Sequence, residues 1–357
     1  MIQEIIQHLD SLTPQDRLFI IFAFVISILL VAVFVFALYI VYLRLRNVRI
    51  AEQWARMEAK WEPLLLDYIT EERSRDEILS EIPREESLHF VDYLQRFAER
   101  LQGSEAALLK QLAAPYLNSI AERTKGGDPP RRARAVRTIG ALGLQQHSEA
   151  LIDALEDESP LVAMIAARAL TDKEYPEYAE AVLDKLHRFD TWSQSYLVSM
   201  LASVGPEITP ALRHTLADPE KSVQVRAVAA DALRSLNDLE AGDIAAQVLD
   251  SESDMNLVAA ALRLIQIVGR PEHLTIVRKL ALSEEFVVRA QALKALGLLG
   301  GEEEWPLLRE GLEHDSNWVA LNAAQGLTSA GGKQILYEIL QSGHQRSDLV
   351  RQVLTSA

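Results

Sequence analysis

Residues 288–300, VRAQALKALGLLG, decide the fold of this 357-residue chain, because their pattern returns along most of the sequence. Strong copies begin at Arg132 and Arg226, and weaker copies keep only the small and apolar positions. The positions equivalent to Gly300 fall at 143, 174, 205, 237, 269, 300 and 331, in steps of 31 or 32 residues. A fixed period of this length predicts a stacked array of repeats.

Each repeat is expected to hold two helices. The first carries small residues that let neighbouring helices approach, and ends near a glycine where a left-handed backbone would stop it. The second often opens with Pro-Glu, as at Pro176, Pro206 and Pro271, because proline suits the first helical turn and glutamate suits the positive end of the helix dipole. One pair cannot bury its apolar faces alone. We therefore expect an all-α chain in which residues 128–357 form an α-solenoid of about seven helix pairs.

Residues 18–43, LFIIFAFVISILLVAVFVFALYIVYL, contain no charge, no glycine and no proline. About 20 apolar residues suffice to cross a bilayer, so this stretch predicts a single transmembrane helix. Thr13 is a suitable N-cap and Pro14 a suitable first helical residue. A cleaved signal peptide is disfavoured, because the preceding residues are acidic and the apolar run is too long.

The basic residues around this stretch predict its orientation. Arg44, Arg46, Arg49 and Arg56 follow it, whereas only Arg17 precedes it. Positive charge marks the cytoplasmic side of a span, so residues 1–17 are expected outside and everything after residue 43 in the cytoplasm, at the cytoplasmic (inner) membrane.

Residues 44–127 are expected to connect the span to the repeats. The sequence has no helix breaker between the span and Pro63, so the helix should continue out of the membrane, and Trp54 and Trp61 should pack against cytoplasmic protein. Two amphipathic helices are predicted at residues 85–101 and 104–123. They are either an N-terminal cap on the array or a small module specific to a partner.

The period, the VRAxALxxLG core and acidic turns such as Asp315-Ser316-Asn317 resemble bacterial HEAT repeats, including the HEAT-like repeats of phycobilin lyases, here with an N-terminal membrane anchor. The resemblance covers about residues 128–357. It implies that the recurring arginines (Arg132, Arg226 and Arg289) bond the neighbouring turn and serve stacking.

Composition and motifs favour a protein that is not an enzyme. The formal net charge of −15 opposes binding to phosphate backbones, which argues against nucleic acid, and the absence of cysteine excludes thiolate metal sites. The Glu272-His273 and Glu313-His314 pairs are expected to be solvated helix residues. We predict no catalytic residue, metal or cofactor. The alternative is a HEAT-fold enzyme of the bilin-lyase or metal-dependent hydroxylase type.

The candidate partner contacts lie on the second helices, which are expected to line the concave side of the solenoid. The acidic candidates are Glu149, Asp153, Glu177, Glu180 and Asp184. They form either a docking surface for a basic segment or merely a soluble surface. The aromatic candidates are Trp192, Trp305 and Trp318, each of which could instead belong to the core.

These features together predict a membrane-tethered adaptor, or scaffold, for protein–protein interaction. The solenoid would bind a protein, and the transmembrane helix would pack against an integral membrane protein of a larger complex. A loose resemblance to tethered HEAT proteins of bacterial envelope systems suggests a polysaccharide-synthesising glycosyltransferase as that partner.

Overall fold

A computed structural model describes residues 14–83, 85–98 and 103–356, and in these ranges the chain is helical without any strand. The chain divides into two compact units, residues 1–93 and 94–357. The helices of the first unit are α2 (Pro14–Ile69), α3 (Arg75–Glu81) and the start of α4 (Ser87–Ala98). An all-α fold is confirmed for the described residues.

Helix α2 begins at Pro14, as predicted, while Thr13 and the rest of residues 1–13 lie outside the described residues. From Phe22 to Leu45 nearly all of its large apolar side chains are exposed, for example Phe24 at 66% and Leu30 at 65%. Among the described residues α2 is long and apolar enough to cross a membrane.

The same helix continues through Pro63 to Ile69, so Pro63 does not end it. Proline removes one helical hydrogen bond, which favours a break. Here Leu64, Leu65 and Tyr68 are buried directly after the proline, and their packing holds the last turns in place.

The end of α2 forms the core of the first unit. Trp61 is fully buried, and its ring centroid lies 5.5 Å from that of Phe90 and 5.6 Å from that of Tyr93. Trp54 contacts His89 edge to face at 5.6 Å. Both tryptophans therefore pack against protein, as expected from their distance beyond the apolar stretch.

Helix α3 was not predicted, because its seven residues are too few to show a helical period. The predicted pair at 85–101 and 104–123 corresponds to α4 and to α5 (Ser104–Glu122), while residues 99–102 lie outside the described part. Helix α5 packs on the first repeat helix, at the N-terminal end of the array.

The second unit contains the seven predicted helix pairs, closed by α20 (Ser347–Ser356). The first helices are α6 (Pro129–Leu142), α8 (Pro160–Leu170), α10 (Gln194–Ala202), α12 (Val223–Leu236), α14 (Met255–Val268), α16 (Phe286–Leu299) and α18 (Asn317–Ser329). The second helices are α7 (Ser148–Ala154), α9 (Ala179–Asp184), α11 (Thr209–Ala217), α13 (Ala241–Ser251), α15 (Leu274–Leu280), α17 (Trp305–Leu312) and α19 (Lys333–Gln341).

The three Pro-Glu sequences form single 3-10 turns ahead of their helices: η1 (Pro176–Tyr178), η3 (Pro206–Ile208) and η4 (Pro271–His273). Two further turns are η2 (Leu186–Phe189), after α9, and η5 (Glu302–Glu304), before α17.

The glycines that end the first helices act in two ways, which corrects the single role expected for them. Gly205 and Gly331 do adopt positive φ, at 108° and 80°. Gly269 and Gly300 do not, with φ of −66° and −95°. A Cβ atom on Gly300 would lie 2.3 Å from Cγ of Glu304, so that glycine is needed for close approach.

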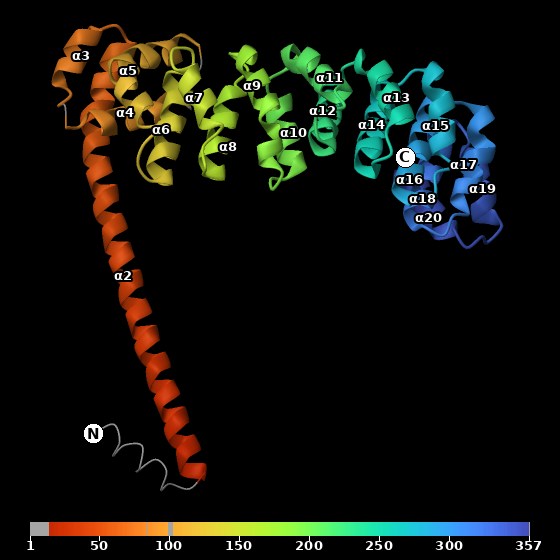
Figure 1. Cartoon of the computed structure of the whole chain (residues 1–357), viewed down its shortest axis with the longest axis horizontal. Coiled ribbons are helices and arrows are strands. Elements are labelled where there is room, and N and C mark those ends of the chain that lie inside the picture. The colour runs from red at the N-terminus through yellow and green to blue at the C-terminus, as the bar shows by residue number, and fades with distance from the viewer. Residues whose placement is uncertain (1–13, 84, 99–102, 357) are drawn as a thin grey trace. The chain divides into compact units, whose positions relative to one another are not determined.

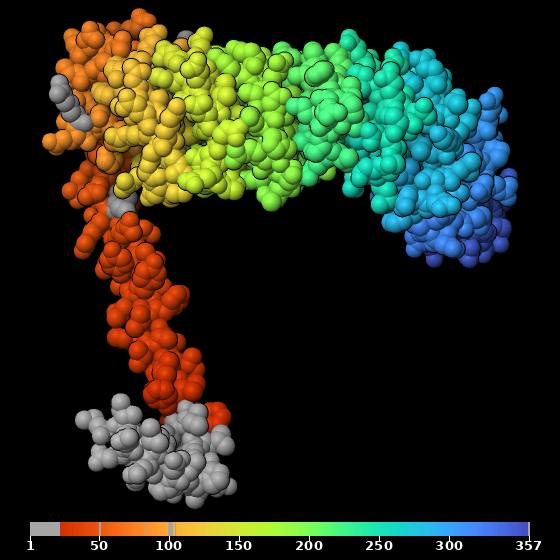
Figure 2. All heavy atoms as spheres, viewed as in Figure 1, coloured from red at the N-terminus to blue at the C-terminus, as the bar shows by residue number. Residues whose placement is uncertain are grey.

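First helices stack on first helices and second helices on second helices, so the array has two rows. In Figure 1 the second helices from α7 to α15 lie along the upper edge and the first helices along the lower edge. From α16 onward the array turns toward the lower side, as Figure 2 also shows. The first helices, rather than the second, therefore lie on the concave side, and the expectation for the second helices is wrong.

Candidate functional site

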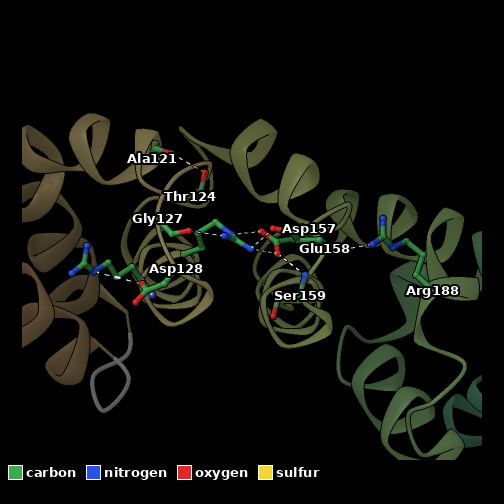
Figure 3. A network of polar contacts seen from close by, with 10 residues as sticks. Ala121, Thr124, Gly127, Asp128, Asp157, Glu158, Ser159 and Arg188 are labelled. Carbon is green, nitrogen blue, oxygen red and sulfur yellow. Dashed lines mark hydrogen bonds and ion pairs between the residues drawn. The ribbon is translucent and has the colours of Figure 1, made fainter.

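Arg132 joins the first two repeats. Its guanidinium donates to both oxygens of Asp157, at 2.7 and 2.9 Å, and to the Gly127 carbonyl at 2.7 Å, and both side chains of the ion pair are only 9% exposed. Arg188, from the next repeat, donates to the Asp157 backbone carbonyl at 2.9 Å (Figure 3). The hydrogen bonds from Arg132 hold the pKa of the Asp157 carboxyl below its ordinary value.

The other two recurring arginines, Arg226 and Arg289, make different contacts with their neighbours. Arg226 donates to the Leu216 carbonyl at 3.0 Å and to Glu252 at 2.6 Å, and so bonds a neighbouring turn as the resemblance implied. Arg289 instead lies 3.5 Å from Glu310 of α17. The arginines serve stacking, although they do not make identical contacts.

The predicted acidic candidates lie on the outer row, where two of the five form ion pairs with a lysine of a neighbouring segment. Asp153 lies 2.8 Å from the Lys125 ammonium, and Asp184 lies 3.0 Å from that of Lys221. Farther along the row, Glu304 accepts hydrogen bonds from Arg278. The other candidates, Glu149, Glu177 and Glu180, are exposed.

His273 differs from the expectation, because it is 5% exposed rather than solvated, whereas Glu272 is exposed as expected. Its Nδ1 accepts from the Arg270 backbone N–H at 3.1 Å, and its Nε2 lies 3.0 Å from Asp243. Asp243, Glu272 and His273 lie close enough together to hold a metal ion. The Arg270 guanidinium, however, pairs with both of these carboxylates. A resident cation of this kind competes with a metal ion, so the cluster is better suited to joining repeats.

The three tryptophan candidates have different surroundings. The Trp305 indole N–H donates to the Ala330 carbonyl at 3.0 Å, which ties α17 to the end of α18. Trp318 is 47% exposed at the start of α18. Trp192 lies beside Tyr196, with ring centroids 5.8 Å apart, in the wall of a groove. The structure therefore does not bring the predicted contact residues together at one site.

That groove, the α8–α10 groove, has a volume of about 750 Å³ and lies between α5, α6, α8 and α10. Helices α8 and α10 approach each other less closely than any other successive first helices. The segment between them holds two 3-10 turns and the six-residue α9, and Trp192 and Tyr196 line the opening. Gly140 and Ala169 also line it.

The charged side chains of the groove are mainly basic: Lys110, Arg137, Arg168 and Lys173 against Asp172 and Glu174. One carboxylate is already used, since Lys110 lies 3.1 Å from Glu174 and 5.4 Å from the centre of the Tyr175 ring. Burial lowers the pKa of Lys110, but the hydrogen bond and the charge of Glu174 outweigh it, so the pKa lies above its ordinary value. Lys110 therefore stays charged at neutral pH.

Sequence reasoning missed this groove, although one signal was present. Arg137 and Arg168 each lie six residues before a repeat-end position, 143 and 174, so they occupy the same place in successive first helices. Side chains at the same place in successive stacked helices lie near each other, because each repeat packs on the next. Two like charges at such neighbouring places repel each other and mark a locally basic surface.

Residues 243–328 match the family model of HEAT repeats. No curated protein matches this sequence. Among solved structures, a triple mutant of the karyopherin Kap121p is 16% identical, with a TM-score of 0.42, over 77% of this chain and 36% of that one. Kap121p bound to RanGTP is 14% identical, with a TM-score of 0.35, over 80% and 40%.

The complex of CpcE and CpcF of phycocyanin lyase from Nostoc sp. PCC7120 is 18% identical, with a TM-score of 0.26, over 72% of this chain and 92% of that one. The chain thus spans well under half of the length of the karyopherin. Residues 243–328 are HEAT repeats by sequence, and the helix pairs before and after them extend the same HEAT-like α-solenoid through the second unit.

Proposed function

We propose that this chain is a membrane-tethered scaffold of the bacterial cytoplasmic membrane, whose solenoid binds a protein partner in the cytoplasm. The observation that carries the proposal is the continuous exposed apolar surface of α2 in a chain that also builds a repeat array. Apolar patches of this size on soluble proteins mark protein or membrane contacts. A helix of 26 residues rises about 39 Å, enough for the roughly 30 Å hydrocarbon core.

The partner we propose is an integral membrane enzyme, with a polysaccharide-synthesising glycosyltransferase as the specific candidate. The Ser27 hydroxyl donates to the Ala23 carbonyl at 2.8 Å, so the only hydroxyl group between residues 18 and 38 is satisfied within its own helix. Ala23 and Ser27 are small residues one turn apart, which suits close packing against another transmembrane helix. The scaffold would then hold its partner through both the span and the solenoid, with no catalytic step of its own.

Orientation can be tested by labelling, because the chain contains no cysteine and single introduced cysteines give no background. Ser11→Cys should react with a membrane-impermeant maleimide in intact spheroplasts, and Ser342→Cys should react only after permeabilisation. Labelling of Ser342→Cys in intact spheroplasts would contradict the cytoplasmic placement of the solenoid.

Partner binding is tested by capturing the full chain from native membranes in detergent and identifying the proteins that accompany it. An integral membrane enzyme should be recovered in constant ratio. Recovery of the chain as a lone monomer at native expression would overturn the scaffold proposal. A coloured or iron-containing preparation would point instead to the bilin-lyase or hydroxylase type of enzyme.

A further inference from the structure

We propose that the α8–α10 groove binds an acidic segment of the partner protein, anchored by one large apolar side chain. This inference rests on the proposed function, because it names the chemistry of the segment that the scaffold recognises.

The same repeat position shows what these arginines lack. Six residues before positions 237 and 269, the chain has Asp231 and Arg263, which pair across adjacent first helices at 2.8 and 3.0 Å. In the first two repeats both places are arginines, Arg137 and Arg168. Arg263 thus has a carboxylate partner on the adjacent first helix, whereas Arg137 and Arg168 have each other's positions occupied by arginine.

The polar contacts of the two arginines leave their charge unmatched. Arg168 donates to the neutral Ser203 hydroxyl at 3.1 Å. Arg137 makes no hydrogen bond or ion pair to any residue in the described part of the chain. Lys173 also lacks a partner there, and Glu174 is already paired with Lys110. The groove is therefore locally basic in a chain of net charge −15.

The groove also offers apolar surface beside these cations. Leu161 is 55% exposed and Tyr196 is 41% exposed, and both line the groove together with Trp192. Tryptophan, tyrosine and arginine are the residues most enriched at the energetic centres of protein interfaces. A ligand that complements the groove therefore carries carboxylates, which pair with the arginines, and a large apolar group, which packs on Leu161, Trp192 and Tyr196.

The exposure of the cations favours a peptide segment over a small anion. Arg137 and Arg168 are exposed and stand on two different helices. A small anion would gain little from two solvated charges, whereas a segment can place successive carboxylates along both helices. The interaction should therefore weaken as salt is added.

The test selects short random peptides from a display library on the full chain in detergent micelles. Enriched peptides should be rich in aspartate and glutamate and carry one large apolar residue. Fluorescence anisotropy then compares a selected peptide on the native chain and on Arg137→Glu with Arg168→Glu, where the affinity should fall roughly tenfold or more. Tyr196→Ala should also weaken binding.

The matched control reverses two exposed cations elsewhere, Arg309→Glu with Lys333→Glu, and should bind as the native chain does. Circular dichroism shows whether each variant is folded. Enrichment of neutral or basic peptides, no enrichment, or equal loss in the control would overturn the proposal. The proposal would also be overturned if the chain bound phosphatidylglycerol vesicles through these arginines but did not bind acidic peptides.

The two proposals fail separately. Labelling and capture depend on the span and on any contact of the solenoid, so they can succeed while peptide selection fails. Conversely, acidic peptides can bind the groove even if the labelling places the solenoid outside the cytoplasm.

Discussion

Gly297 of α16 and Gly326 of α18 meet backbone to backbone, because a Cβ atom on Gly297 would lie 2.2 Å from the Cα atom of Gly326. No real Cβ contact is that short, and the obstacle is backbone rather than a movable side chain. The closeness of these two helices depends on the absence of a side chain at residue 297. The close packing of α16 on α18 therefore requires glycine at residue 297.

Gly297→Ala should lower the free energy of unfolding by about 3 kcal/mol, at the upper end of the usual cost of overpacking a core. Urea unfolding followed by circular dichroism measures the change. Gly301→Ala is the control, since its φ is −130° and no atom lies within 4 Å of the added Cβ, so its effect should stay within about 0.5 kcal/mol. Equal losses in both variants would refute the close contact.

Asp231→Ala should destabilise the middle of the array, because this carboxylate, 7% exposed, accepts from both Arg263 and Gln194. The expected loss is about 2–3 kcal/mol, below the usual cost of breaking a fully buried pair because Arg263 remains 31% exposed. Asp250→Ala removes a solvated pair 3.6 Å from Lys279 and should cost less than about 1 kcal/mol. Urea unfolding of the two variants compares them, and a smaller loss for Asp231→Ala would contradict its role.

Stability should fall in acid, because the pKa of Asp157 is lowered in the folded chain by the hydrogen bonds from Arg132. A carboxyl with a depressed folded pKa stabilises above its unfolded value of about 3.9, and that contribution disappears as the pH falls through this value toward the folded one. The thermal midpoint of the native chain should therefore begin to drop near pH 5 and keep falling as the pH goes below the unfolded pKa of about 3.9.

Asp157→Asn should start with a lower midpoint at pH 7 and lose less on acidification, because the titrating group is gone. Glu158→Gln is the control, since Glu158 is 88% exposed and lies 3.5 Å from Arg132. It should follow the native profile. Parallel pH profiles for Asp157→Asn and the native chain would show that this ion pair does not set the acid limit.

Leu30→Arg with Val33→Arg should reduce membrane recovery, because each arginine near the centre of a span costs about 2.5–3.5 kcal/mol on insertion scales. Fractionation of cells and alkaline extraction of the membranes measure the change. Leu66→Arg makes the same substitution in α2 at a site 55% exposed beyond the apolar stretch, and should remain in the membrane fraction. Unchanged recovery of the double variant would contradict the span.

The helix pairs were predictable because the same local sequence pattern recurs every 31 or 32 residues. The short α3 was not, since seven residues show no period, and the extension of α2 past Pro63 depends on the burial of Leu64 and Leu65. His273 shows the same limit, because its burial comes from groups a repeat away, Asp243 among them. The groove was missed because its walls come from several helices that are far apart in the sequence.

The sequence by itself determined the period, the two-helix unit and the uncharged stretch at residues 18–43, since each depends only on residue types at fixed spacing. Tertiary structure decided which row faces the concave side, because curvature adds up small rotations between repeats that no single repeat encodes. It also decided which charges are neutralised. Asp231 meets Arg263 across two stacked helices, while Arg137 and Arg168 meet no carboxylate in the described chain.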